Sequence, residues 1–466
     1  MSGPRRTLGF GDLVLFYIVT GISLRWIAVA AAAGPSSLAV WALAFAAFYV
    51  PLALSVVELS SRLPDEGGLY VWTKHAFGDF AGFMAGWSYW ASNLAYFPGV
   101  LYFSAQGALH VGGGRWAGLA ASPTYFVVFS LAGLALATAM NLAGLRVGTW
   151  LHNAGALGTW LPVAALLGLA AVQLAVGRHA GGATTFDAAS LVPRPRLADL
   201  VFAAAIVYAF GGCESASLLG GEIRDPRKNL PRALVAGGAL IALSYLAGTA
   251  AALVLLPRAE RSALGGFMQA IEAGATRAGA PWLTPAVALL VSVGALGGVG
   301  AWLTATARLP FVAGLDRYLP PAFGRLDPRT GAPRVALLTQ AALGALFVLF
   351  SQAGSSVRSA YDVLVSTGVV TYMVPYLFLF ASLIRLQRHP AGPDVVRVPG
   401  GRLAATALGC LGFVTACAAL ALSLLPPDDE PNKALSVFKV VGLSTAQLVV
   451  GAAVYAAGRA KRAKAV

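Results

Sequence analysis

The sequence predicts an all-α integral membrane protein with twelve transmembrane helices. Of its 466 residues, 58% are hydrophobic and only 11% are charged, whereas about a quarter of the residues of a soluble domain are charged. The apolar residues form long blocks such as 125–142, and about twenty apolar residues are enough to cross a bilayer as a helix. Backbone groups in lipid must bond within their own segment, so these blocks are expected to be helical.

Twelve blocks along the chain are long enough to be spans. They cover residues 12–33, 36–60, 80–108, 123–143, 151–176, 198–220, 233–256, 283–307, 334–352, 360–384, 403–425 and 436–458. Two connections, 64–78 and 258–281, are partly apolar and could hold short helices at the membrane surface. No separate soluble domain is expected, and the first block is too long and starts too early for a cleavable signal.

The excess of basic residues indicates topology rather than nucleic-acid binding. The net charge is +14, but Lys and Arg occupy short gaps between the apolar blocks instead of one patch or stripe. With the N-terminus placed inside, the gaps on that side hold 22 Lys and Arg, against 10 on the other side. We therefore expect a multi-pass protein of the inner (plasma) membrane of a prokaryotic cell, with both termini cytoplasmic and no nucleic-acid partner.

Two spans contain stretches in which a regular helix is unfavourable. Residues 19–25 read VTGISLR and residues 209–214 read AFGGCE. Glycines weaken a helix, and a charge buried in the membrane is costly without a partner. Four unbroken spans separate the two breaks, so each break opens a block of five spans, and the blocks enter the membrane from opposite sides. This pattern is typical of an inverted-repeat transporter. The glycines could also serve close helix packing, but two corresponding breaks favour a solute site.

Four stretches resemble the amino acid–polyamine–organocation superfamily of secondary transporters. They are residues 209–216 (AFGGCESA) continued by 222–233 (EIRDPRKNLPRA), Glu58-Leu59 with 63–72 (LPDEGGLYVW), 141–144 (NLAG), and 316–323 (DRYLPPAF) followed by Pro333. The resemblance covers spans 1–10 in order. It implies a LeuT-type fold with discontinuous helices 1 and 6, two inverted repeats of five helices at 1–197 and 198–400, and spans 11 and 12 with a basic tail at 401–466.

By this resemblance the chain is a secondary active transporter that moves amino acids by alternating access, through exchange or proton-linked symport. The expected partners are a small amino acid solute, the lipid bilayer and H⁺ or Na⁺ as a candidate co-ion, and the oligomeric state is not predicted. A transporter of amines, polyamines or another organocation, or a non-transporting sensor on the same fold, is the alternative. The five histidines and three cysteines are scattered, so no enzyme site, metal or cofactor is expected.

The backbone at the two breaks is the first candidate for holding the solute. An unwound helix leaves N–H groups for a carboxylate and C=O groups for an ammonium group. The resemblance places aromatic gates at Tyr208 and Trp302, with Phe210 close by. Polar residues of spans 3 and 10 complete the lining, although they could equally be helix-packing groups. The predicted substrate-binding residues are Gly21, Ile22, Ser23, Leu24, Arg25, Asn93, Tyr96, Tyr208, Phe210, Gly211, Gly212, Cys213, Trp302 and Ser366.

Glu214 and Arg25 are the charged residues at the breaks. A carboxyl group at mid-bilayer readily takes up a proton, so Glu214 is the candidate proton or charge switch, with a fixed partner of backbone groups or of Arg25 as the alternative. Arg25 departs from the family, which usually has small residues there. Its planar fork suits carboxylates, so it could pair with Glu214, bind an acid of the solute, or act as a gate. Its charge disfavours arginine, agmatine and polyamines as solutes.

Span 5 bears on the coupling ion. Some proton-coupled relatives have a lysine at the position that Thr159 occupies, and span 5 of this chain contains no lysine. A lysine-type proton mechanism is therefore disfavoured. Exchange, a proton step at Glu214 and sodium coupling all remain open.

Overall fold

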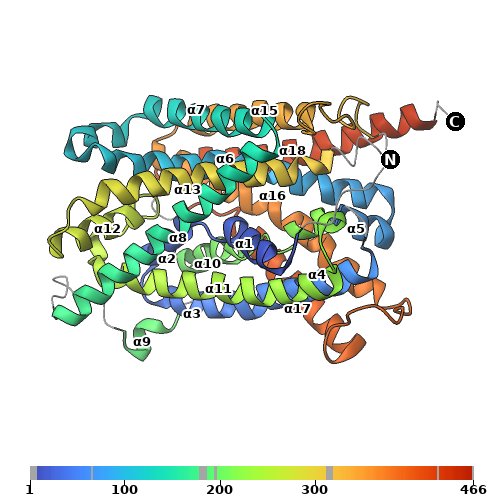
Figure 1. Cartoon of the computed structure of the whole chain (residues 1–466), viewed down its shortest axis with the longest axis horizontal. Helices are drawn as coiled ribbons and strands as arrows, with labels where there is room; N and C mark the ends of the chain where they lie inside the picture. Colours follow the sequence, from blue (N-terminus) through green and yellow to red (C-terminus); the bar gives the residue numbers. More distant parts are fainter. Residues whose placement is uncertain are drawn as a thin grey trace.

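The computed structural model describes residues 8–64, 67–177, 186–193, 197–310, 318–427 and 430–463. Every regular element in these ranges is a helix, and the helices form one bundle (Figure 1). Within the described ranges the only extended pairing is an isolated bridge between Leu8 and Ile223. The all-α prediction is therefore confirmed.

The first predicted break is present. Helix α1 (Phe10–Gly21) and helix α2 (Leu24–Ala33) are bent by 48°, and the two residues between them are extended, with φ −96° and −127°. Gly21 ends α1 where the chain passes very close to helix α11 (Pro226–Leu255), because a Cβ atom there would lie 2.5 Å from the Cδ1 atom of Ile241. The first span is thus discontinuous at the predicted place.

The second predicted break is also present. Helix α10 (Leu197–Ala209) ends at mid-span, an irregular turn follows, and a 3₁₀ segment, η4 (Ser215–Glu222), continues the chain. Gly212 in the turn has φ +109°, which residues with a Cβ atom rarely adopt. The glycine pair therefore sets where the helix stops.

The remaining helical elements include all other predicted blocks, although α8 and α11 begin six and seven residues before the predicted bounds. They are α3 (Ser36–Ala44), the π-turn η1 (Phe45–Tyr49), α4 (Val50–Arg62), α5 (Leu69–Phe77), α6 (Asp79–Ala108), η2 (Leu109–Val111), η3 (Gly113–Ala121), α7 (Pro123–Leu142), α8 (Leu145–Val176), α9 (Ala188–Leu191), α11 (Pro226–Leu255), η5 (Arg258–Glu260), α12 (Gly266–Arg277), α13 (Leu283–Thr306), α15 (Arg334–Gln352), α16 (Val357–Leu386), α17 (Gly401–Leu422) and α18 (Lys433–Ala463). The two partly apolar connections hold α5 and α12, as expected.

Fewer helices pass a test of length and apolar composition than the twelve predicted spans. Among the described residues, nine helices are long and apolar enough to cross a membrane, or ten if the bent pair of α1 and α2 is one span. The difference from twelve lies in α6 and α10. Helix α6 has 30 residues but contains many Gly, Ser, Tyr and Trp residues, and α10 has only 13 residues because the break shortens it.

Glycine contacts let the central helices approach closely. Helices α8 and α13 meet at Gly155 and Gly297, where a Cβ atom on Gly155 would lie 2.6 Å from the Cα atom of Gly297. Small residues allow this kind of approach where lipid supplies no hydrophobic drive. Helix α5 and the end of α18 lie at one end of the bundle, and α9 and α12 lie at the other (Figure 1). The two breaks lie between these ends.

Candidate functional site

The two breaks lie against each other, and a tyrosine of α11 joins them. The hydroxyl group of Tyr245 donates to the carbonyl of Gly21 at 2.7 Å and accepts from the N–H of Ser23 at 3.1 Å. It also lies 3.5 Å from the carbonyl of Ala209, the last residue of α10. One side chain thus satisfies backbone groups that unwinding of the first span leaves free, and it touches the end of the sixth.

Trp302 of α13 lies between the breaks. Its indole Nε1–H donates to the carbonyl of Thr20 at 3.3 Å, and a Cβ atom on Gly212 would lie 3.3 Å from its ring. The ring is buried and packs against Tyr96 with centroids 5.8 Å apart and Tyr89 with centroids 6.3 Å apart. The predicted aromatic residue of span 8 therefore contacts both breaks.

Glu214 is enclosed by hydroxyl donors. Its Oε1 atom accepts from Tyr89 at 2.6 Å, Tyr376 at 2.9 Å and Tyr372 at 3.0 Å, and its Oε2 atom accepts from the N–H of Gly212 at 3.2 Å. The side chain is fully buried. An ionised carboxylate accepts from hydroxyl groups, whereas a protonated carboxyl also donates to one, and tyrosine hydroxyls can do both. We call these three tyrosines the tyrosine cage.

Arg25 does not pair with Glu214, which was one of the arrangements considered for it. The side chain is 1% exposed. Its guanidinium carbon lies 4.2 Å from the ring centroid of Trp26 and 5.0 Å from that of Tyr96. Among the described residues, its Nε and Nη2 atoms have no hydrogen-bond partner. The tyrosine cage binds the carboxyl group of Glu214, and the guanidinium group of Arg25 packs against the faces of two aromatic rings.

The remaining predicted residues lie at different distances from the breaks. Tyr208 packs edge-on against Trp26 at 5.4 Å and Tyr372 at 5.1 Å, which places it between Arg25 and the tyrosine cage. The side chain of Phe210 turns away and packs against Trp41 at 5.3 Å, so only its backbone faces the break.

The polar lining candidates form no hydrogen bond to the breaks in the described structure. Asn93 donates to the carbonyl of Tyr89 at 2.9 Å within α6, which is a helix-internal bond. Ser366 is half-buried in α16, and no hydrogen bond among the described residues joins it to the breaks. Cys213 is buried next to Glu214, and its thiol is free.

Sequence reasoning missed the residues that satisfy the breaks. The tyrosine cage and Tyr245 come from spans 3, 7 and 10, far from either break along the chain. A tyrosine within an apolar block carries a hydroxyl that must find a partner when buried. That rule marks such residues as candidates for polar contacts, but it does not say which buried group each one contacts.

A small cavity reaches the first break from the side of α8 and α11. It has a volume of about 240 Å³ and is lined by Ile22, Thr159, Val163, Leu240 and Ser244, among others. Thr159 donates to the carbonyl of Gly155 at 2.9 Å within α8. The position discussed for coupling thus lies beside the first break, and its hydroxyl bonds to its own helix.

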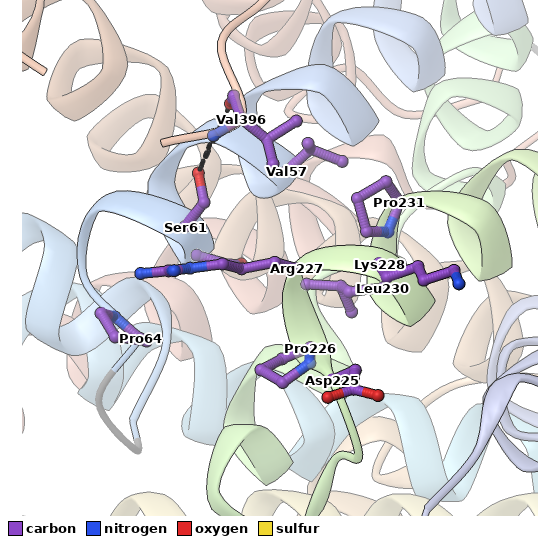
Figure 2. Close-up of a pocket in the computed structure, with 11 residues that line it drawn as sticks. Val57, Ser61, Pro64, Asp225, Pro226, Arg227, Lys228, Leu230, Pro231 and Val396 are labelled. Carbon is purple, nitrogen blue, oxygen red and sulfur yellow. Dashed lines mark hydrogen bonds between the residues drawn. The ribbon is translucent and has the colours of Figure 1, made fainter. Parts of the chain in front are cut away.

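A larger cavity lies at another part of the bundle. It has a volume of about 500 Å³ and lies between α4, the start of α11 and the connection from α16 to α17 (Figure 2). Its described lining includes Val57, Asp225, Arg227 and Val396 but none of the predicted solute-binding residues. Arg227 pairs with Asp394 at 3.3 Å. We therefore do not assign the solute to this cavity.

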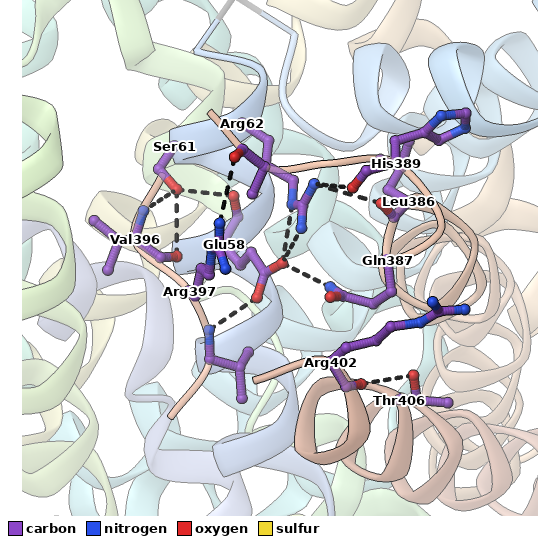
Figure 3. Close-up of polar contacts among 12 residues, drawn as sticks. Glu58, Ser61, Arg62, Leu386, Gln387, His389, Val396, Arg397, Arg402 and Thr406 are labelled. Carbon is purple, nitrogen blue, oxygen red and sulfur yellow. Dashed lines mark hydrogen bonds and ion pairs between the residues drawn. The ribbon is translucent and has the colours of Figure 1, made fainter. Parts of the chain in front are cut away.

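A polar network holds the same region together (Figure 3). The Oε1 atom of Glu58 accepts from Arg62 at 2.7 Å and from Gln387 at 2.6 Å, and its Oε2 atom accepts from the N–H of Val398 at 2.8 Å. Glu58 is 1% exposed. The glutamate that contributed to the family resemblance therefore fastens the end of α4 to the segment after α16.

Comparisons with known proteins agree with this architecture. The family model for amino acid permeases matches residues 8–446. An uncharacterized transporter of Legionella pneumophila is 28% identical over 94% of both chains. A glutamate/gamma-aminobutyrate antiporter of Lactococcus lactis is 24% identical over 84% of this chain and 79% of its own. A serine/threonine exchanger of Bacillus subtilis is 25% identical over 80% of this chain and 81% of its own.

Proposed function

This chain belongs to the amino acid permease family of multi-pass membrane transporters and is not an enzyme, and on that basis we propose that it moves amino acids across the inner membrane by alternating access. The observation that carries the proposal is the meeting of two broken spans around Trp302 and Tyr245. Broken helices place free backbone groups at mid-membrane, where an amino acid can be bound through its main chain.

The proposal includes a LeuT-type arrangement of twelve spans. Residues 1–197 and 198–400 would form two inverted repeats, and residues 401–466 would add the last two spans. Breaks in the first helix of each repeat support this division. The distribution of Lys and Arg supports cytoplasmic termini.

Alternating access requires contacts that form on one side of the site and open in turn. The amide of Arg224 donates to the carbonyl of Leu8 at 2.9 Å, so the segment before α1 is fastened to the segment after η4. On our orientation this contact closes the cytoplasmic side. Its opening would let α1 swing away from the bundle, while the Trp302–Thr20 and Tyr245–Gly21 bonds determine how far the break can move.

We propose Glu214 as the proton or charge switch of this cycle. Three hydroxyl donors meet at one of its oxygens, and a protonated carboxyl would itself become a donor. Uptake of a proton would therefore require at least one tyrosine of the cage to turn its hydroxyl. Because Tyr372 also packs against Tyr208, such a turn would be felt next to Arg25. Exchange without a co-ion and coupling to sodium are the alternatives to this proton-linked cycle.

Counterflow in proteoliposomes tests the proposed function. Vesicles containing the purified protein are loaded with an unlabelled mixture of the common amino acids, and entry of each labelled amino acid is followed. We expect at least one amino acid to accumulate transiently above its level in protein-free vesicles. Binding without counterflow would indicate a sensor, voltage-driven current without saturation would indicate a channel, and counterflow of amines alone would indicate an organocation transporter. Each of these results would overturn the proposal.

A further inference from the structure

We propose that Arg25 determines the solute class, and that the site is built for an acidic amino acid whose side-chain carboxylate binds to the edge of this guanidinium that lacks hydrogen bonds in the described structure. The inference rests on the proposed function, because it assumes that the solute lies between the two breaks.

The guanidinium group of Arg25 is buried, and one of its edges lacks hydrogen bonds in the described structure. Arg25 is 1% exposed, and its Nε and Nη2 atoms have no partner among the described residues. These two nitrogens form one side of the guanidinium, and their N–H groups point in parallel. A parallel pair of this kind matches the two oxygens of a carboxylate. This edge therefore has the geometry of a carboxylate site, whereas a single orphaned nitrogen would not.

Two aromatic rings pack against the guanidinium group of Arg25. Trp26 and Tyr96 lie near the faces of the guanidinium, with centroids 4.2 and 5.0 Å from its central carbon. Ring faces stabilise the positive charge, and in the described structure the Nε and Nη2 atoms remain without a hydrogen bond. Tyr96 also contacts Trp302, which touches both breaks. Tyr96 thus contacts both Arg25 and Trp302, and Trp302 lies at the proposed solute position.

The N-terminus of α2, next to Arg25, is a second position that can bind an anion. Helix α2 begins at Leu24, and Ser23 at its N-terminus provides no side-chain cap. The first turn of a helix has N–H groups without intrahelical partners and attracts anions. This end of α2 can take the α-carboxylate, which leaves the fork of Arg25 for another acid. A solute with two carboxylates uses both positions, and a neutral amino acid uses one.

Among the described residues, no acidic side chain pairs with Arg25. Glu214 accepts bonds from the tyrosine cage and from Gly212, and Tyr208 packs between this cage and Trp26. A buried arginine without an acid is costly in a membrane. Binding of a solute carboxylate removes that cost, whereas an amine would be repelled.

The close contact between Gly99 and Arg25 offers a variant that keeps the charge of Arg25. A Cβ atom on Gly99 of α6 would lie 2.8 Å from the Nη1 atom of Arg25. Gly99→Ala therefore pushes the guanidinium without removing it. Arg25→Gln removes the charge, and Arg25→Lys keeps the charge but loses the fork. Arg277→Gln is the matched control, because Arg277 bonds to the carbonyl of Leu255 at the end of α11 and touches neither break.

The test is calorimetric binding to purified protein with glutamate and aspartate, each paired with its amide, glutamine and asparagine. The buffers contain either chloride or sulfate, and variants are used only after they elute as single species. We expect wild type and Arg277→Gln to bind one of the acids at least tenfold more tightly than its amide. The preference should fall to about onefold in Arg25→Gln and weaken in Arg25→Lys and Gly99→Ala.

Three outcomes overturn the inference, and they separate it from the proposed function. Equal or tighter binding of the amides by wild type removes the acidic solute but leaves amino acid transport standing. Binding of neutral amino acids that requires chloride shows that Arg25 holds an inorganic ion. Binding of amines and no amino acid removes the proposed function and the inference together.

Discussion

In the sixth span the buried carboxyl group of Glu214 contacts three hydroxyl groups and one backbone N–H. In the first span the buried charge of Arg25 rests on two aromatic rings and keeps one edge without hydrogen bonds in the described structure. Both groups lie beside a break, and both are almost completely buried. The protein itself satisfies the acid, and we infer that the solute satisfies the base.

This difference separates two tasks that one ion pair would merge. A buried ion pair between Arg25 and Glu214 would satisfy both groups and leave neither for a ligand. The tyrosine cage prevents that pair by supplying Glu214 with other partners. On our proposals, the sixth span therefore serves a change of protonation at Glu214, and the first span serves recognition of the solute by Arg25.

Gly212→Ala should have the largest effect on transport, because it strains the backbone at the sixth-span break. The glycine has φ +109°, and an added Cβ atom would lie 3.3 Å from Trp302. Strain of this kind costs about 1–3 kcal/mol, and we expect counterflow to be lost. Gly298→Ala is the control, since a Cβ atom there meets nothing within 4 Å. Wild-type counterflow in Gly212→Ala would show that this turn does not shape the site.

Glu214→Gln should have the next largest effect. With the amide oxygen facing the tyrosine cage, the new NH₂ group would face the N–H of Gly212, so two donors would oppose each other. We expect a loss of about 3 kcal/mol in the free energy of unfolding and uptake that no longer varies with pH. Uptake across a pH series and denaturant unfolding measure the two effects, with the exposed Glu260→Gln as control. An unchanged pH profile would remove the switch role.

Tyr245→Phe should have a smaller effect on both breaks together. It removes the hydroxyl that serves the carbonyl of Gly21 and the N–H of Ser23, which costs about 1–2 kcal/mol. Tyr17→Phe is the control, because the hydroxyl of Tyr17 is buried without a partner in the described structure. Thermal unfolding in detergent should separate the two variants. Equal melting temperatures would mean that water or lipid replaces the bridge.

Glu58→Gln should have the smallest effect on transport. Glu58 joins α4 to Gln387 and Val398, away from both breaks. The new NH₂ group would face either Arg62 and Gln387 or the N–H of Val398, so we expect a loss of about 3 kcal/mol in the free energy of unfolding, with the ratio of affinities for different solutes unchanged. A changed ratio would show that this network is coupled to the site.

The sequence predicted the breaks well, because their cause is local. Gly21 and the Gly211-Gly212 pair interrupt apolar blocks, and both helices stop there. The partners of the breaks could not be predicted in the same way. Tyr372 and Tyr89 lie 158 and 125 residues from Glu214 in the sequence, and hydropathy gives no register between spans. Helix length alone also misses the sixth span, because the break shortens α10 to 13 residues.

The most direct test of the central claim is a structure determined with bound acidic amino acid. We predict a solute carboxylate within hydrogen-bond distance, about 2.7–2.9 Å, of both Nε and Nη2 of Arg25, and Glu214 still within its tyrosine cage. A solute carboxylate that instead lies among the hydroxyls of Tyr89 and Tyr372, or an Arg25 that turns to pair with Glu214, would contradict the account.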